Sequence, residues 1–345
     1  MAQPGSAARE PLTFHAAPAV IEGPMNEDLS NLRSPISRLK LSVADGKLVS
    51  DIGETFPILS DIPRFVPAEN YASDFGRQWN HFRRTQLDSV TGLPLSKDRL
   101  ARCFCGELSQ VAGKRVLEAG SGAGRFTEIL LDHGAKLDSF DYSSAVEANA
   151  ANNGTRPMTL VQADIRQMPF EPASYDYVVC LGVLQHTPNT EESIAKLWEM
   201  VRPGGAVVLD HYRLTRWSFP PPIGGGGYLR RKKFLRLAAD RRWDAVRQYV
   251  DRWFPIYWRH RDNKWMRRVL ARIGGINFYY PSLPLASKQD HYEWSLLDTH
   301  DATTDYYRRY RTVASIERTL KSLGATAAHV WKGGNGVEAF ARKPI

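Results

Sequence analysis

The 345-residue chain is long enough to bury a large core, and its apolar fraction of 43% predicts a globular protein. No run of about 18 apolar residues is present, which argues against a transmembrane helix, and the first 25 residues lack the apolar core of a signal peptide. The net charge is +9, and the three cysteines form no Cys-x-x-Cys pair, which favours a reducing cytoplasmic location.

Three segments precede the main pattern of the chain. Residues 1–28 are rich in alanine, proline and glycine, and we expect a disordered tail. Residues 29–70 predict a compact β module, because polar and apolar residues alternate over 38–43 and Asp45-Gly46 favours a hairpin turn. Residues 71–113 are rich in aromatic side chains and predict a helical lid or linker.

From residue 114 onward, strand and helix patterns alternate. This alternation predicts an α/β fold with a Rossmann-like, doubly wound sheet. The expected strands are 115–119, 136–141, 158–163, 175–180 and 206–211. The expected helices lie near 124–133, 143–152, 190–201 and 312–323, and a last hairpin joins 327–330 to 336–341. The sheet domain is therefore expected to comprise 114–213 and 291–345.

Residues 214–290 interrupt this pattern and predict a basic, tryptophan-rich helical insert. Three prolines and four glycines at 220–227 favour a hinge at its start. Between Tyr228 and Arg272, 15 basic and 4 acidic residues give a charge of +11, so the rest of the chain sums to −2. Three interpretations are open: a solvated helical face, a surface for an anionic membrane, or a site for a phosphate-bearing acceptor.

The most informative motif follows the first expected strand. Glu118 ends an apolar run, and Gly120, Gly122 and Gly124 lead into a helix-like segment. Glycines permit a tight strand-to-helix turn and let a ligand approach the backbone closely. The dinucleotide fingerprint Gly-x-Gly-x-x-Gly requires a glycine where this sequence has Arg125. The loop therefore differs from the loops that bind dinucleotides.

Further ligand-binding residue types occur at the ends of the next expected strands. In open α/β sheets the ligand binds at the carboxyl ends of the strands. Asp141 ends the second strand, about 20 residues after the glycines, and suits hydrogen bonds to two ribose hydroxyls. Asp164 follows the third strand, and residues 181–186 follow the fourth.

The acid and alternate glycines of this loop, in order with these strand ends, resemble the class I S-adenosylmethionine-dependent methyltransferases (type 11-like) over about 115–212. The resemblance implies that the loop holds the amino-acid end of S-adenosylmethionine and that Asp164 and Ile165 meet the adenine. The cofactor-binding residues expected on this basis are Glu118, Gly120, Ser121, Gly122, Asp141, Tyr142, Ala163, Asp164, Ile165, Leu181, Gly182 and Gln185. No metal site is expected.

The β module resembles the Trm112-like zinc-ribbon module, through the apolar stretch 56–66 with its Phe-Pro-Ile and Ile-Pro pairs. The two cysteine pairs of such modules correspond here to Ser34 and Ser37, and to the region of Val49 and Ile52. Zinc requires thiolates or imidazoles. We therefore expect a degenerate module that keeps its shape without the metal.

The candidate catalytic residues are His186, Asp210 and His211. His186 follows the fourth strand, where the acceptor is expected, and an unperturbed histidine pKa of about 6.5 suits proton removal near neutrality. Alternatively, His186 satisfies a loop carbonyl or touches the cofactor. Asp210 and His211 end the fifth strand, where either could orient or deprotonate the acceptor.

The resemblance implies methyl transfer to a hydroxyl or carbon of a small-molecule, lipid or glycan acceptor. Residues 180–183 lack the Asn/Asp-Pro-Pro-aromatic motif of enzymes that methylate nucleobase amines, which disfavours nucleic acid as a partner. The alternative is a non-catalytic, cofactor-binding subunit that activates a partner enzyme. We expect a cytoplasmic protein, and peripheral contact of 228–272 with the inner membrane face is an open alternative.

Overall fold

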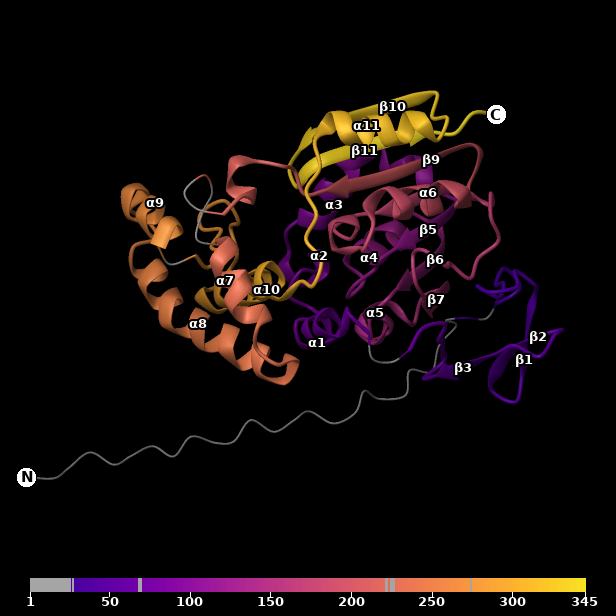
Figure 1. The fold of residues 1–345 in the computed structure, drawn as a ribbon, viewed down its shortest axis with the longest axis horizontal. Coiled ribbons are helices and arrows are strands. Elements are labelled where there is room, and N and C mark those ends of the chain that lie inside the picture. The colour runs from indigo at the N-terminus through magenta and orange to yellow at the C-terminus, as the bar shows by residue number, and fades with distance from the viewer. Residues whose placement is uncertain (1–25, 27, 68–69, 221–222, 224–226, 274) are drawn as a thin grey trace, which may run out of the picture.

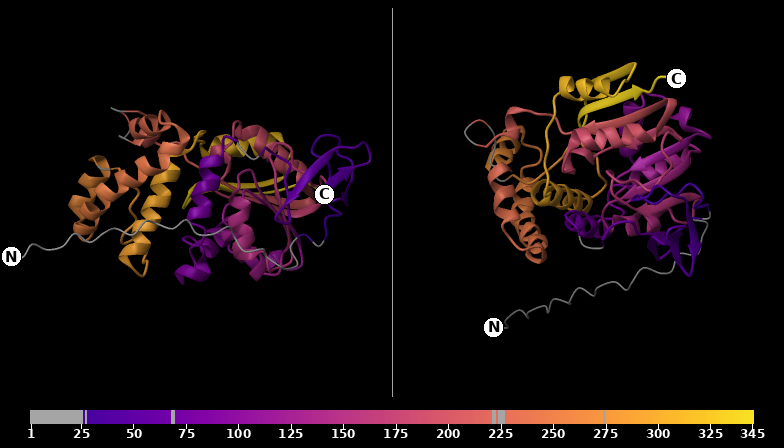
Figure 2. Two further views of the ribbon diagram at one scale, coloured as in Figure 1. Left: turned by 90° about the horizontal axis from the view of Figure 1, so that it is seen from below. Right: turned by 45° about the vertical axis from the view of Figure 1, so that its right-hand side comes forward.

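The computed structural model describes residues 26, 28–67, 70–220, 223, 227–273 and 275–345. A seven-stranded sheet with helices on both faces forms the centre, and a small antiparallel sheet and a helical domain lie at opposite ends (Figures 1 and 2). The expected tail, 1–28, lies outside the described residues except for Asn26 and Asp28. Asn26 donates its backbone N–H to Met158 O at 3.0 Å, so this point of the expected tail is bound to the sheet edge.

The central sheet has the strand order β10-β11-β9-β8-β5-β6-β7. Its parallel strands are β5 (Arg115–Ala119), β6 (Lys136–Asp141), β7 (Met158–Gln162), β8 (Tyr175–Cys180) and β9 (Val201–His211). β11 (Gly336–Arg342) pairs antiparallel with both β9 and β10 (Ala327–Gly333). The predicted Rossmann-like α/β fold is confirmed. β9 begins before the predicted strand because Val201 already pairs with Tyr175, ahead of an irregularity in the ladder.

Helices cover both faces of this sheet. One face carries α3 (Leu95–Cys103), α4 (Arg125–Asp132) and α5 (Ala145–Asn153), and the other carries α6 (Thr190–Met200) and α11 (Val313–Ser322). Successive strand side chains point to opposite faces, so Leu117 packs in one apolar cluster and Val116 in the other. The remaining short elements are α1 (Ser73–His81), α2 (Asp88–Thr91), η1 (Leu108–Val111), η2 (Leu184–His186) and η3 (Arg216–Ser218).

The N-terminal module is an antiparallel sheet of β1 (Leu41–Ala44), β2 (Lys47–Ser50), β3 (Thr55–Leu59) and β4 (Ile62–Pro63), in that order. It joins the central sheet beside β7, where Phe65 N–H donates to Gln162 O at 2.8 Å. Leu32, Leu48 and Phe56 of the module are buried in the same apolar cluster as Phe170.

Serine hydroxyls organise two turns of this module. Ser34 Oγ accepts hydrogen bonds from the backbone N–H groups of Ile36 and Ser37 at 3.1 Å, and Ser37 Oγ donates to Glu54 Oε2 at 2.6 Å. In the second turn, Ser50 Oγ accepts from the Glu54 N–H at 3.1 Å, so a serine holds the region of Val49 and Ile52 to which the second cysteine pair was expected to correspond. Among the described residues no group of three histidine, cysteine, aspartate or glutamate side chains could bind a metal ion.

The helical domain contains α7 (Gly227–Leu235), α8 (Ala239–Arg259), α9 (Lys264–Ile273) and α10 (Lys288–Thr304). Its apolar core joins Phe234, Val250 and Phe254 to Leu296 and Leu297 of α10. Because α10 buries these side chains against α7 and α8, the sheet domain resumes after α10 and not at the expected residue 291. No described helix is both long enough and apolar enough to cross a membrane.

Two buried histidines couple folding to pH. His300 on α10 donates from Nδ1 to Gln78 Oε1 at 2.6 Å, and burial lowers its pKa to about 3. Burial likewise lowers the pKa of His211 to about 4. In the unfolded chain a histidine takes up a proton below about pH 6.5, whereas these two stay neutral in the folded chain. Each therefore lowers the free energy of unfolding progressively as the pH falls below about 6.5.

We predict that His300→Gln reduces this acid sensitivity. Between pH 6.5 and 4.5 its free energy of unfolding should fall by about 2 kcal/mol less than that of the unmodified protein. Urea denaturation at both pH values measures the difference, and His329→Gln, at an exposed histidine, is the matched control. Equal acid sensitivity in His300→Gln and the unmodified protein would contradict the assignment.

Candidate active site

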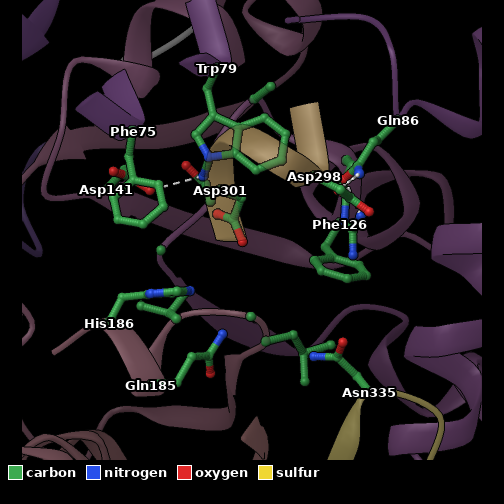
Figure 3. Close-up of a pocket in the computed structure, with 18 of the residues that line it drawn as sticks. Phe75, Trp79, Gln86, Phe126, Asp141, Gln185, His186, Asp298, Asp301 and Asn335 are labelled. Carbon is green, nitrogen blue, oxygen red and sulfur yellow. Dashed lines mark hydrogen bonds between the residues drawn. The ribbon is translucent and has the colours of Figure 1, made fainter. Parts of the chain in front are cut away.

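A cavity of about 710 Å³ lies at the carboxyl ends of the parallel strands, between the loops that follow them and side chains of α1 and α10 (Figure 3). Eleven of the twelve predicted cofactor-binding residues line it. They are Gly120, Ser121, Gly122, Asp141, Tyr142, Ala163, Asp164, Ile165, Leu181, Gly182 and Gln185. The strand order thus brings four separate stretches of sequence together around one cavity.

The glycine loop provides bare backbone at one wall. Gly120 has a φ of +79°, and a Cβ on it would lie 2.2 Å from Val183 Cγ2, so no side chain fits there. Gly124 has a φ of +87° and starts α4, and a Cβ on it would lie 2.1 Å from Asn149 Oδ1. The first glycine therefore shapes the cavity wall, whereas the third allows α4 to pack closely against α5.

Glu118, the twelfth predicted residue, does not line the cavity. Its Oε2 accepts hydrogen bonds from Thr127 Oγ1 at 2.5 Å and Ser139 Oγ at 2.8 Å, and burial raises its pKa to about 7. These contacts tie β5 to β6 and α4. The structure therefore places Glu118 behind the glycine loop, where it holds the elements that form the cavity wall.

Two carboxylates border the expected adenosine site. Asp141 accepts hydrogen bonds from the N–H groups of Gly122 at 2.9 Å and Ser143 at 2.8 Å, and from the Ser143 hydroxyl at 2.7 Å. Burial raises its pKa. Asp164 forms an ion pair of 2.7 Å with Arg166. Both carboxylates are thus held in fixed orientations while they line the cavity.

Gln185 also lines the cavity, and its side chain is only 1% exposed. Neither its Oε1 nor its Nε2 has a hydrogen-bond partner among the described residues. A buried polar group without a partner costs about 1–3 kcal/mol. A bound ligand with both a donor and an acceptor group would remove that cost.

His186 lies on the cavity wall opposite Trp79 (Figure 3). Its Nδ1 is 3.2 Å from the carbonyl oxygen of Tyr307 and 3.4 Å from Asp305 Oδ2. Both neighbours are hydrogen-bond acceptors, so the neutral ring carries its proton on Nδ1 and leaves Nε2 as a proton acceptor. The rings of Phe75 and Tyr212 pack at centroid distances of 4.9 and 5.5 Å and fix the imidazole plane.

The structure does not place Asp210 and His211 at the cavity with His186. Fully buried Asp210 accepts from the Gly182 N–H at 2.6 Å and from Arg99 Nε at 3.0 Å. His211 points to the opposite sheet face, since adjacent strand residues alternate, and its Nε2 lies 3.2 Å from Thr190 Oγ1. Asp210 therefore holds the loop after β8 and the Arg99 side chain, and His211 packs against α6.

The remaining wall carries charged residues that are not among the site residues assigned from the sequence. Asp298 and Asp301 are three residues apart on α10 and so share a helix face, and both line the cavity. Burial, followed by the charge of Asp301, raises the pKa of Asp298 to about 6. Arg125 lines the same cavity and donates to Gln86 Oε1, and burial lowers its pKa to about 9. The helical spacing of the two aspartates was the only available signal.

Parts of this chain are similar in sequence to known proteins. A protein-family profile described as a methyltransferase domain matches residues 117–209. Ubiquinone biosynthesis O-methyltransferase of Pseudomonas putida (strain GB-1) is 30% identical over 162 residues, which cover 42% of this chain and 69% of the relative. The protein of that name from Pseudomonas savastanoi pv. phaseolicola is 34% identical over 158 residues, covering 41% and 67%.

A solved structure from Methanococcus maripaludis, described as an S-adenosyl-L-methionine-dependent methyltransferase, aligns with 81% of this chain and 97% of its own. The identity is 13% and the TM-score 0.43.

Proposed function

Because the chain belongs to the S-adenosylmethionine-dependent methyltransferases, we propose that it methylates a hydroxyl, or a carbon, of a small-molecule, lipid or glycan acceptor, with His186 as the general base. The observation that carries the proposal is the environment of His186. Its Nδ1 faces two hydrogen-bond acceptors, and its ring borders the cavity. The names of the relatives, which are O-methyltransferases, support an oxygen acceptor.

The cavity residues fit S-adenosylmethionine, which supplies an electrophilic methyl group on its sulfonium. Gly120 and Gly122 line the cavity with backbone alone, Asp141 offers a carboxylate to hydroxyl donors, and the buried Gln185 amide lacks a partner among the described residues. Arg125 and Asp298 carry opposite charges at the cavity and suit the carboxylate and the ammonium of an amino acid. We therefore assign cofactor binding to the eleven lining residues named above, without Glu118.

His186 would remove the acceptor's proton. The acceptor hydroxyl would hydrogen-bond to Nε2, and its proton would move to Nε2 as the oxygen bonds to the methyl carbon and the carbon–sulfur bond breaks, which leaves S-adenosylhomocysteine. The resulting imidazolium lies 3.4 Å from the Asp305 carboxylate, which stabilises its charge. Proton removal of this kind contributes about 10²–10⁴-fold in rate, and the close approach that the cavity walls enforce supplies further acceleration.

The direct test is release of S-adenosylhomocysteine in the presence of phenolic, lipid and glycan acceptors. We expect turnover with at least one hydroxyl acceptor, with the label of a methyl-labelled donor on oxygen in the product. Cofactor binding in calorimetry, without turnover on any acceptor, would favour the alternative of a non-catalytic subunit that activates a partner enzyme. The serine-based turns of the Trm112-like module are compatible with either role.

We assign the surface of the helical domain a peripheral contact with an anionic membrane, which would place the protein at the cytoplasmic membrane face. Large apolar side chains are exposed on this domain, with exposed fractions of 67% for Trp265, 60% for Ile273 and 56% for Leu229. Exposed Lys264 and Arg268 flank Trp265 on α9. Cationic helices with exposed tryptophan favour the interface of anionic bilayers.

We predict flotation of the protein with anionic liposomes at low salt and its release at high salt, because salt screens the attraction to the lipid headgroups. Neutral liposomes should leave it in the soluble fraction. Replacing both Lys264 and Arg268 with glutamine should weaken binding, whereas the same change at Lys40 and Lys47 of the β module is the matched control. Absence of binding to anionic liposomes at low salt would exclude the membrane contact.

A further inference from the structure

Asp305 is a buried carboxylate, at the end of α10, that contacts three cationic or protonatable groups. Arg231 Nε donates to its Oδ1 at 2.6 Å, and Arg308 Nε donates to its Oδ2 at 2.7 Å. His186 Nδ1 lies 3.4 Å from the same Oδ2. The side chain of Asp305 is fully buried, so water does not compete for these contacts.

Arg231 also holds the backbone around Asp305. It donates to the carbonyl oxygens of Asp305 and Tyr306, the latter at 2.9 Å. The next carbonyl, that of Tyr307, is the second acceptor at His186 Nδ1. Both groups that orient the imidazole therefore lie within residues 305–307. The guanidinium of Arg231 on α7, 74 residues before Asp305 in the sequence, holds this segment in place.

The segment is further attached to the turn that carries His186. Arg309 donates its backbone N–H to Gln185 O at 2.8 Å and its side chain to Pro188 O at 2.9 Å. Residues 305–309 thus bridge the helical domain and the loop after β8. Movement of α7 away from the sheet domain would displace the acceptors of His186 Nδ1.

We propose that Asp305 is a positioning residue for His186, and that Arg231 makes the orientation of His186 depend on docking of the helical domain against residues 305–307. This inference rests on the proposed role of His186 as the base. Contact of the helical domain with an acceptor or a membrane would then affect proton transfer at His186 through the ion pair of Arg231 with Asp305.

The charge of Asp305 is suited to this role. Burial alone would raise its pKa, but Arg308, His186 and Arg231 together bring the pKa below its ordinary value. The carboxylate is therefore ionised when His186 accepts a proton. Of the other titratable or charged groups, Arg308 contacts the same Asp305 Oδ2, the ring of Tyr212 packs on the imidazole, and His211 interacts with His186 through charge alone.

The test compares Asp305→Asn, Arg231→Gln and the control Lys233→Gln, which removes an exposed charge from the same helix. We expect kcat to fall on the order of 10²-fold in Asp305→Asn and about tenfold in Arg231→Gln, and to change less than twofold in Lys233→Gln. Calorimetric affinity for S-adenosylmethionine should change less than threefold in all three variants.

A readout without turnover separates this inference from the proposed function. The ¹⁵N chemical shifts of His186 report which ring nitrogen carries the proton. We expect a single Nδ1–H tautomer in the unmodified protein and a mixture in Asp305→Asn and Arg231→Gln.

A different tautomer in the unmodified protein, or the same tautomer in every variant, would overturn the positioning role. The positioning role would also be overturned if Asp305→Asn lost activity, cofactor affinity and melting temperature together, because Asp305 would then be needed only for folding. The expected tautomers together with full activity of His186→Gln would instead remove the proposed base.

Discussion

Replacing His186 with glutamine should lower kcat by about 10²-fold and leave the affinity for S-adenosylmethionine within about threefold. Glutamine retains hydrogen-bonding groups at the cavity wall but cannot take up a proton near neutral pH. Initial rates of S-adenosylhomocysteine release at saturating substrates give kcat, and calorimetry gives the cofactor dissociation constant. The loss should appear in kcat, because the proton moves only in the transition state.

The matched control is His211→Gln, at the other histidine near the carboxyl ends of the strands. Its ring packs toward Thr190 on the opposite sheet face and does not border the cavity. We therefore expect kcat within about threefold of the unmodified protein. Full activity in His186→Gln would exclude the histidine as base, and equal losses in both variants would point to general disturbance of the loop after β8.

The strand-end part of the site could be predicted from the sequence because it is local. A buried run followed by Gly120 and Gly122, or by Asp141, specifies a strand and the turn at its carboxyl end, and the parallel order then brings these turns together. The same reasoning placed Asp210 and His211 at the site, although adjacent strand residues face opposite ways. Their partners, Arg99 and Thr190, lie far from them in sequence.

The remaining wall depends on contacts that no local pattern contains. Asp305 and Tyr307 reach His186 across about 120 residues, and Arg231 reaches Asp305 across 74. Residues from 291 were expected to continue the sheet domain, but they belong to the helix α10, which packs in the helical domain. Asp298 and Asp301 line the cavity beside the apolar Trp294 and Leu297, and Leu296 packs in the core of the helical domain, so apolar side chains lie on more than one face of α10 and no simple apolar periodicity was visible.

Replacing Asp141 with asparagine should raise the dissociation constant for S-adenosylmethionine by about 10²-fold, equivalent to about 2.7 kcal/mol. Hydrogen bonds to an ionised carboxylate are stronger than those to a neutral amide, so the ribose hydroxyls that we propose to bind at Asp141 would lose binding energy. The carboxylate also accepts from the Gly122 N–H at 2.9 Å and from two donors of Ser143. An amide group presents one acceptor oxygen, so it cannot serve both Gly122 and Ser143, and the glycine loop loses one of its anchors.

Calorimetry with the cofactor measures the change, and thermal unfolding without ligand separates it from a general loss of stability. Asp132→Asn is the control, because Asp132 is exposed at the end of α4 and pairs with Arg156 away from the cavity. We expect its cofactor affinity to change less than twofold. Unchanged affinity in Asp141→Asn would remove Asp141 from the cofactor site. A weakened affinity with a preserved melting temperature would show that the variant loses binding free energy for the cofactor and not stability of the fold. Since kcat at saturating cofactor should then stay near that of the unmodified protein, Asp141 and His186 would separate cofactor binding from proton removal within one cavity.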